Sequence, residues 1–183
     1  HELGHKPNAA DQWGAKLVNA VTGYAHFCIE HNRGHHIMVA TPEDPASARL
    51  NESLYRFALR ELPGTAKRGW QLERERMAKK DLPFWHWRND LLQGYAIAGM
   101  TAVILVLWLG PAILPFLLAH HFIGWFQLTQ ANYVEHYGLL RQKLPSGRYE
   151  PCQPRHSWNT NHIVSNLMLF HLQRHSDHHA NPL

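Results

Sequence analysis

The stretch from Leu91 to Val134 contains no Asp, Glu, Lys or Arg, and this feature limits the possible folds more than any other. As helix at about 1.5 Å per residue, these roughly 44 residues would extend about 66 Å, enough to cross a hydrocarbon core of about 30 Å twice. Pro111, which follows Gly110 near the middle, lacks a backbone N–H and interrupts a helix. We therefore predict two membrane helices, residues 91–109 and 111–131, closed into a hairpin. The alternative is one long buried helix of a soluble protein.

Basic residues flank this hairpin on both sides. They are Arg56, Arg60, Lys67, Arg68, Arg74, Arg76, Lys79 and Lys80 before it, and Arg141, Lys143, Arg148, Arg155 and Arg174 after it. Under the positive-inside rule this bias indicates that both flanks face the cytosol, as two crossings require. A nucleic-acid-binding surface is also basic, but here acidic residues are interspersed among the positive charges. We therefore expect no nucleic-acid partner.

The size and composition are compatible with a single domain. The chain has 183 residues, of which 45% are hydrophobic, and a formal net charge of +4. Because it begins inside a motif and ends just after another, we expect one domain over residues 1–183 that is truncated at both ends. Cys28 and Cys152 form neither a disulfide framework nor a CxxC metal pattern.

Outside the hairpin the sequence also predicts helices. Apolar residues within residues 8–29 recur at spacings of three and four. The segment TPEDP (41–45) predicts a helix start, and Leu-Pro-Gly (62–64) predicts the end of that helix. Ser157 is expected to cap a final helix from Trp158 onward. The predicted fold class is thus all-α, an integral-membrane helical bundle with a cytosolic histidine-rich site.

Three short segments place histidines three or four residues apart: HELGHK, EHNRGHH and RHSDHH. At these spacings two side chains lie on one helical face, about one turn apart. Neutral imidazole is the commonest metal ligand, so such histidines can converge on one ion or on two neighbouring ions. A single pair is more often a solvated or hydrogen-bonded face. Three boxes beside a membrane hairpin instead indicate a metal centre.

The number of histidines favours two metal ions. The boxes supply His1, His5, His31, His35, His36, His175, His178 and His179. A zinc ion needs only four ligands. Because two crossings return the chain to its starting side, His136 in NYVEHYGLLR emerges on the side of the boxes and can reach the same cluster.

In this order, HELGHK, EHNRGHH, NYVEHYGLLR and LQRHSDHHA resemble the signature motifs of the integral-membrane alkane 1-monooxygenases, or alkane hydroxylases. The first, second and fourth are similar to those of all histidine-box desaturases and hydroxylases, whereas HYG is typical of alkane hydroxylases and xylene monooxygenases. The resemblance implies two non-haem iron ions, with ligands His1, His5, His31, His35, His36, His136, His175, His178 and His179. Spacing alone does not select iron, because imidazole also suits zinc, copper and nickel.

The resemblance also implies an enzyme of the bacterial cytoplasmic membrane, multi-pass, with its metal site on the cytosolic side. Such an enzyme inserts one oxygen atom of O2 into the terminal C–H bond of a medium-chain n-alkane, giving a primary alcohol and water. Rubredoxin, reduced by rubredoxin reductase, supplies the two electrons. We expect the apolar hairpin to form part of the alkane channel within membrane lipid, the basic loops to dock rubredoxin, and roughly four further spans to precede HELGHK.

Two interpretations are possible for each of five residues near the predicted ligands. Glu2, Glu30, Glu135 and Asp177 can accept the outer N–H of a metal-bound imidazole or can simply face solvent. His171 lies one turn before His175, but outside the motif, and is expected to support or pack beneath the cluster.

Two other classes of protein are alternatives. One is another histidine-box enzyme, such as a xylene monooxygenase or a fatty-acid hydroxylase or desaturase. The other is a non-catalytic metal carrier or transporter. A transporter would be expected to hold its ligands within the membrane spans, whereas the boxes lie outside them.

Overall fold

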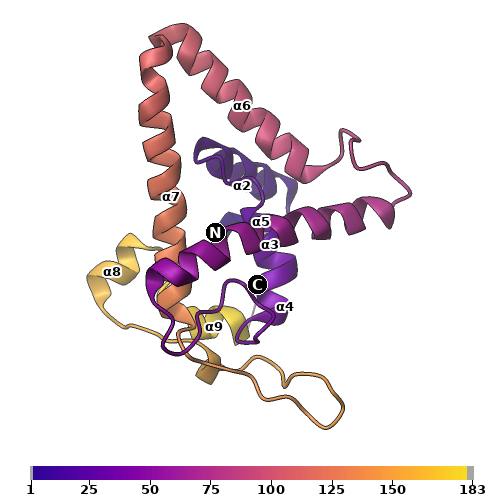
Figure 1. The fold of residues 1–183 in the computed structure, drawn as a ribbon, viewed down its shortest axis with the longest axis vertical. Coiled ribbons are helices and arrows are strands. Elements are labelled where there is room, and N and C mark those ends of the chain that lie inside the picture. The colour runs from indigo at the N-terminus through magenta and orange to yellow at the C-terminus, as the bar shows by residue number, and fades with distance from the viewer. Residues whose placement is uncertain (1, 181–183) are drawn as a thin grey trace. The chain divides into compact units, whose positions relative to one another are not determined.

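The structure of the protein is a computed structural model, which describes the backbone of residues 2–180 and the side chains of residues 3–179. Over these residues the chain is helical (Figure 1), and its only pairing of extended backbone is one isolated bridge between Lys143 and Tyr149. The elements in chain order are α1 (Glu2–His5), α2 (Ala9–Val21), α3 (Phe27–Glu30), the π-helix η1 (His31–His35), α4 (His36–Met38), α5 (Leu54–Ala78), α6 (Asp90–Leu109), the 3-10 helix η2 (Pro111–Ile113), α7 (Leu114–Glu135), the 3-10 helix η3 (Pro154–His156), α8 (Ile163–Met168) and α9 (His175–Ala180). The predicted all-α class is confirmed.

The chain divides into two compact units. The hairpin unit comprises His1–Gly34 and Thr65–Leu128, and the cluster unit comprises His35–Gly64 and Thr129–Leu183. The hairpin unit contains both predicted membrane helices, except for the last residues of α7. The cluster unit contains most of the histidines predicted as metal ligands.

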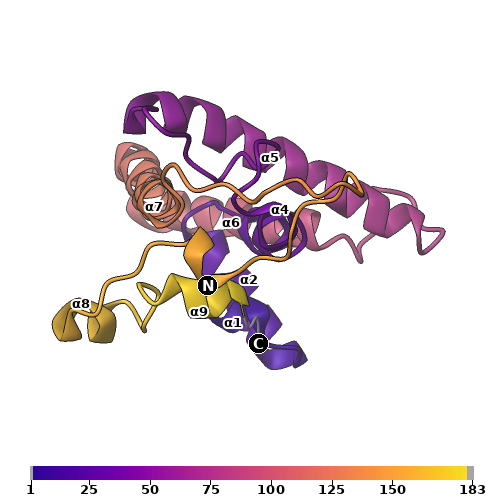
Figure 2. The same ribbon diagram turned by 90° about the horizontal axis from the view of Figure 1, so that it is seen from below.

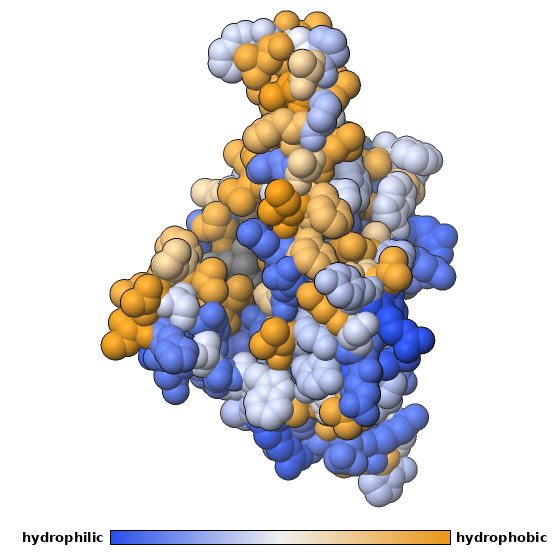
Figure 3. Space-filling model, turned by 60° about the vertical axis from the view of Figure 1, so that its left-hand side comes forward, coloured by the Kyte–Doolittle hydropathy of each residue, from blue (hydrophilic) through white to orange (hydrophobic). Residues whose placement is uncertain are grey.

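The predicted hairpin is present. Both α6 and the segment Pro111–Glu135 are long and apolar enough to cross a membrane. Only 11% of the most apolar stretch of α6, and 6% of that of Pro111–Glu135, is buried. Gly110 separates them with φ of 79°, a conformation that glycine adopts without strain. The two helices diverge from this turn (Figure 1), and hydrophobic side chains cover the turn at the top of Figure 3. Such an exposed apolar surface suits contact with lipid.

A polar network joins α5 to the first residue of α6. Glu73 is fully buried, and its carboxylate accepts hydrogen bonds from Arg76 Nε (2.7 Å) and from the backbone N–H of Asp90 (2.6 Å). Asn89 caps α6, because its Oδ1 accepts the N–H groups of Leu91 (2.9 Å) and Leu92 (3.0 Å). These contacts fix the entry of the chain into the first membrane helix.

The helix predicted over residues 8–29 is interrupted. It consists of α2 and α3, separated by a turn at Gly23, where φ is +63°. This conformation ends a right-handed helix. A side chain at Gly23 would also come within 3.0 Å of Nδ1 of His121 on α7. The sequence period continues through the turn, but the positive φ of Gly23 breaks the helix where α7 packs closely against it.

The prediction for the next helix was wrong at both ends. The segment after Thr41 forms turns rather than helix, because the Asp44 carboxylate accepts the Ala46 N–H (3.2 Å) and the Ser47 hydroxyl (2.6 Å). Helix α5 starts at Leu54 and continues through Pro63 to Ala78. Pro63 deprives the Leu59 carbonyl of its helical partner, but both residues lie on the exposed side, where water can replace the lost hydrogen bond.

The predicted final helix from Trp158 is replaced by a loop and two short helices, α8 and α9. Phe170 and His171 between them have φ of 51° and 63°, which cannot continue a right-handed helix. The Asn166 amide holds the loop by donating to the Thr160 carbonyl (2.9 Å). Figure 2 shows α9 beside the orange segment that contains η3, whereas α8 extends away from it.

Candidate metal centre

Four histidines from three separate segments meet inside the cluster unit. His35 comes from η1, His136 follows α7 directly, and His175 and His179 lie one turn apart on α9. One ring nitrogen from each lies within 4.8 Å of the others. All four side chains are buried, with exposed fractions between 0% and 5%. The structure thus brings together members of the second and third boxes and the HYG histidine.

The outer nitrogens of two of these rings have hydrogen-bond acceptors. His136 Nδ1 lies 3.0 Å from the backbone carbonyl of His156, and His35 Nδ1 lies 2.8 Å from the Asp44 carboxylate. A carbonyl can only accept, so the single proton of a neutral His136 is on Nδ1. The buried Asp44 carboxylate selects the same tautomer of a neutral His35. The Nε2 atoms of both rings are therefore left with lone pairs.

The Nε2 atoms of three rings converge. Nε2 of His175 lies 3.1 Å from Nε2 of His136 and 2.8 Å from Nε2 of His179. A neutral imidazole has one N–H, so these nitrogens cannot satisfy all of these contacts as hydrogen bonds. A metal ion among them would accept several lone pairs at once. The donor set and the orientation of the rings therefore fit a metal ion.

Burial keeps the imidazoles of His136, His175 and His179 neutral. It lowers the pKa of His136 to about 3, with neighbouring His35 lowering it further. Burial also lowers the pKa values of His175 and His179 well below the usual value, again reinforced by the other histidines. Only the neutral imidazole has a lone pair to give to a metal. At neutral pH these side chains are thus ready to bind.

A further pair lies in the cluster unit. Nε2 of His36 is 2.9 Å from Nε2 of His178, and both side chains are half-buried. His36 follows His35 in sequence, yet the two rings lie 6.2 Å apart at 85° to each other. Neighbouring helical residues point about 100° apart, so adjacent histidines of one box can belong to two different groups of ligands. The π-helical turn η1 immediately precedes this point, and such turns are frequent at functional sites.

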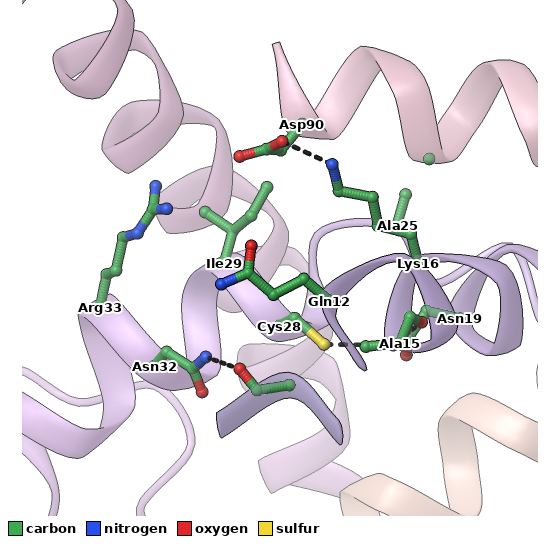
Figure 4. Close-up of a pocket in the computed structure, with 12 residues that line it drawn as sticks. Gln12, Ala15, Lys16, Asn19, Ala25, Cys28, Ile29, Asn32, Arg33 and Asp90 are labelled. Carbon is green, nitrogen blue, oxygen red and sulfur yellow. Dashed lines mark hydrogen bonds and ion pairs between the residues drawn. The ribbon is translucent and has the colours of Figure 1, made fainter. Parts of the chain in front are cut away.

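The first box and the start of the second box meet in the hairpin unit. The rings of His5 and His31 lie 5.1 Å apart, edge to face, and Phe27 stacks on His31 at 5.2 Å. The Asn32 amide donates to the backbone carbonyl of Gly4 (2.6 Å), beside a cavity of about 100 Å³ (Figure 4). Asn32 thus ties the two boxes together. His1 lies outside the described residues.

The carboxylates near the ligands have different surroundings. Glu135 lies within 3.3 Å of His175 Nε2 and therefore faces the four-histidine cluster. Glu30 is buried and accepts a hydrogen bond from Arg68 Nε (2.7 Å). Asp177 is exposed, and the side chain of Glu2 lies outside the described residues.

Sequence reasoning missed two groups that orient ligands. Asp44 was not identified because it lies nine residues after His35, although its place in the TPEDP turn after the second box was a usable signal. The backbone carbonyl of His156 has no sequence signal. The structure also places His171 on the surface, so it does not pack beneath the cluster as expected.

An apolar membrane hairpin and a buried cluster of histidines define a class, the histidine-rich metalloproteins of membranes. A family comparison makes this specific. The chain belongs to the fatty acid desaturase family, whose model matches residues 1–183.

Several curated relatives are similar along nearly the whole chain. Alkane 1-monooxygenase of Pseudomonas putida is 56% identical over 182 residues, which cover 100% of this chain and 45% of that protein. Alkane 1-monooxygenase 1 of Alcanivorax borkumensis is 57% identical with the same coverage. The xylene/toluene monooxygenase hydroxylase component XylM of Pseudomonas putida is 25% identical, over 98% of this chain and 47% of that protein. The chain thus spans about half the length of the curated relatives it matches.

Proposed function

We propose that the protein containing this chain is an alkane 1-monooxygenase that hydroxylates the terminal carbon of medium-chain n-alkanes. The observation that carries the proposal is the identity of 56–57% to alkane 1-monooxygenases, in a match that covers the whole chain. In the overall reaction an alkane, O2, two electrons and two protons give a primary alcohol and water. Rubredoxin, itself reduced by rubredoxin reductase, supplies the electrons.

The metal centre that we propose contains two iron ions. His35, His136, His175 and His179 would hold one ion, because their donor atoms already converge. From the family resemblance we expect the other predicted ligands to complete the second site: His1, His5, His31, His36 and His178. When bound, the irons supply the redox chemistry that activates O2.

Three sets of protein groups bear on this reaction. Asp44 and the His156 carbonyl hold ligand rings in the tautomer that binds metal. Glu135 lies beside the four-histidine cluster, where a bound cation would favour its ionised form. The apolar helices α6 and α7 provide a route through lipid for a substrate that has no polar group to recognise.

The electron donor and the membrane placement are further parts of the proposal. Basic residues flank the hairpin on both sides, which favours a cytosolic location for both flanks in the bacterial inner membrane. The same charges would attract an acidic rubredoxin and raise its association rate.

The alternative with specific support is a xylene monooxygenase, because XylM also matches nearly the whole chain. Its identity of 25% is less than half of the 56–57% to the two alkane enzymes named above, so we prefer the alkane substrate. A substrate test with the full-length protein in membranes decides between them. We expect 1-octanol from n-octane in the presence of O2, rubredoxin and its reductase, and about two irons per chain.

Parallel reactions with xylene and a fatty acid serve as comparisons. Turnover of either one without any 1-octanol would reject the alkane assignment. A protein that contains zinc alone would reject the di-iron centre and favour a metal carrier.

A further inference from the structure

The C-terminal half of α5 and the turn before α6 form a groove in the hairpin unit. Its volume is about 430 Å³, and its lining consists of Lys67, Trp70, Gln71, Arg74, Phe84 and Trp85. We call it the aromatic groove. The four lining residues from α5 are spaced as one face of a helix, and all four are exposed.

Aromatic rings form the floor of the aromatic groove. Trp70 and Phe84 stack with ring centroids 5.0 Å apart and planes at 24°, and Trp85 stands edge-on to Phe84 at 5.3 Å. The Asn89 amide donates to the Phe84 carbonyl (2.8 Å) while its oxygen caps α6. The floor is therefore held by the same residue that starts the membrane helix.

This attachment places the aromatic groove at the edge of the bilayer. Trp85 precedes Asp90, the first residue of α6, by only five positions. Trp85 and Trp87 are 76% and 70% exposed, and Arg88 lies over the Trp87 ring at 5.1 Å. Exposed tryptophans beside the end of a membrane helix are typical of the lipid headgroup region.

The charges of the aromatic groove are all positive. Lys67 and Arg74 lie about one turn to either side of Trp70, and no acidic residue lines the groove. Neither cation forms an ion pair with a residue in the described part of the chain. An apolar floor between two available cations suits a molecule with an anionic head and an apolar tail.

We propose that the aromatic groove binds an anionic phospholipid of the cytosolic leaflet. The phosphate lies between Lys67 and Arg74, and an acyl chain lies along Trp70 and Phe84. A lipid fits better than a soluble acidic protein, because the groove is continuous with the membrane boundary and much of its lining is apolar. This proposal depends on membrane insertion and not on the reaction that the protein catalyses.

Native mass spectrometry of the full-length protein tests the proposal, using nanodiscs that contain phosphatidylglycerol or phosphatidylcholine. The double variant Lys67→Gln/Arg74→Gln removes both cations and is expected to bind phosphatidylglycerol about 10- to 30-fold more weakly. Lys79→Gln/Lys80→Gln removes the same charge from exposed positions at the end of α5, outside the groove, and should change binding less than about twofold. Trp70→Ala keeps the charges and should weaken binding of both lipids.

Equal losses in the two double variants would mean a general charge effect and would reject the site. Unchanged phosphatidylglycerol binding in Lys67→Gln/Arg74→Gln would also reject it. If that variant retains lipid but binds reduced rubredoxin more weakly, the groove is a protein-docking surface instead. Circular dichroism verifies that each variant is folded.

Discussion

His136 shows how one side chain is prepared for metal binding by its surroundings. Its Nδ1–H donates to the His156 carbonyl, its Nε2 faces His175, and burial keeps it neutral. None of these three conditions depends on its neighbours in sequence. They explain why the HYG histidine belongs to the cluster although it is far from all three boxes.

Replacing His136 with alanine should remove a ligand from the four-histidine cluster. We expect the full-length protein to lose about one of its two irons. Its rate of alkane hydroxylation should fall more than about 100-fold. Iron analysis and 1-octanol formation measure both effects. His171→Ala is the matched control, because His171 is exposed and lies outside the cluster. Normal iron content in His136→Ala would show that this residue is not a ligand.

Asp44 should act on the metal through His35. Asn in its place keeps the size of the side chain but removes the charge that orients the His35 ring. Iron affinity should fall about 10- to 100-fold, as measured by competition with a chelator. Glu43→Gln is the control, because Glu43 is an exposed carboxylate that contacts Tyr149 instead. Similar iron affinities in the two variants would contradict this role.

At the scale of helices, the first membrane helix depends on a buried cap. Asn89→Ala removes the acceptor for Leu91 and Leu92 N–H and the donor to Phe84. The free energy of unfolding should fall by about 1–3 kcal/mol, measured by thermal or denaturant unfolding in detergent. Asn89→Asp keeps the cap acceptor and should lose less. If alanine and aspartate have the same effect, the cap is not the source of the stability.

Helix ends were harder to predict than helices. The long apolar stretches of α6 and α7 were identified because their length and lack of charge are local properties. The break at Gly23 and the continuation of α5 through Pro63 depend on neighbours distant in sequence and on exposure. The sequence signals at these positions were real but not decisive, since glycine permits a turn without requiring one.

For the whole molecule, the exposed apolar surface of the hairpin determines where the protein resides. Met100 lies near the middle of α6 and is 59% exposed. Met100→Arg should oppose insertion by about 2.5–3.5 kcal/mol and shift protein from the membrane fraction to aggregates. Met100→Leu should insert normally. An arginine variant that fractionates normally would argue that this face of α6 contacts protein or water rather than lipid.

The sequence by itself determined the all-α class, the membrane hairpin and the set of histidines from which ligands are drawn. Length, absence of charge and spacing are properties of short segments, so they can be read without coordinates. Only the tertiary structure decided which histidines meet in one cluster, which groups orient them, and that His35 and His36 serve different partners. The physical reason is that a metal site needs donor atoms a few ångströms apart. Here those atoms come from segments more than a hundred residues apart in sequence, and only the folded chain brings them together.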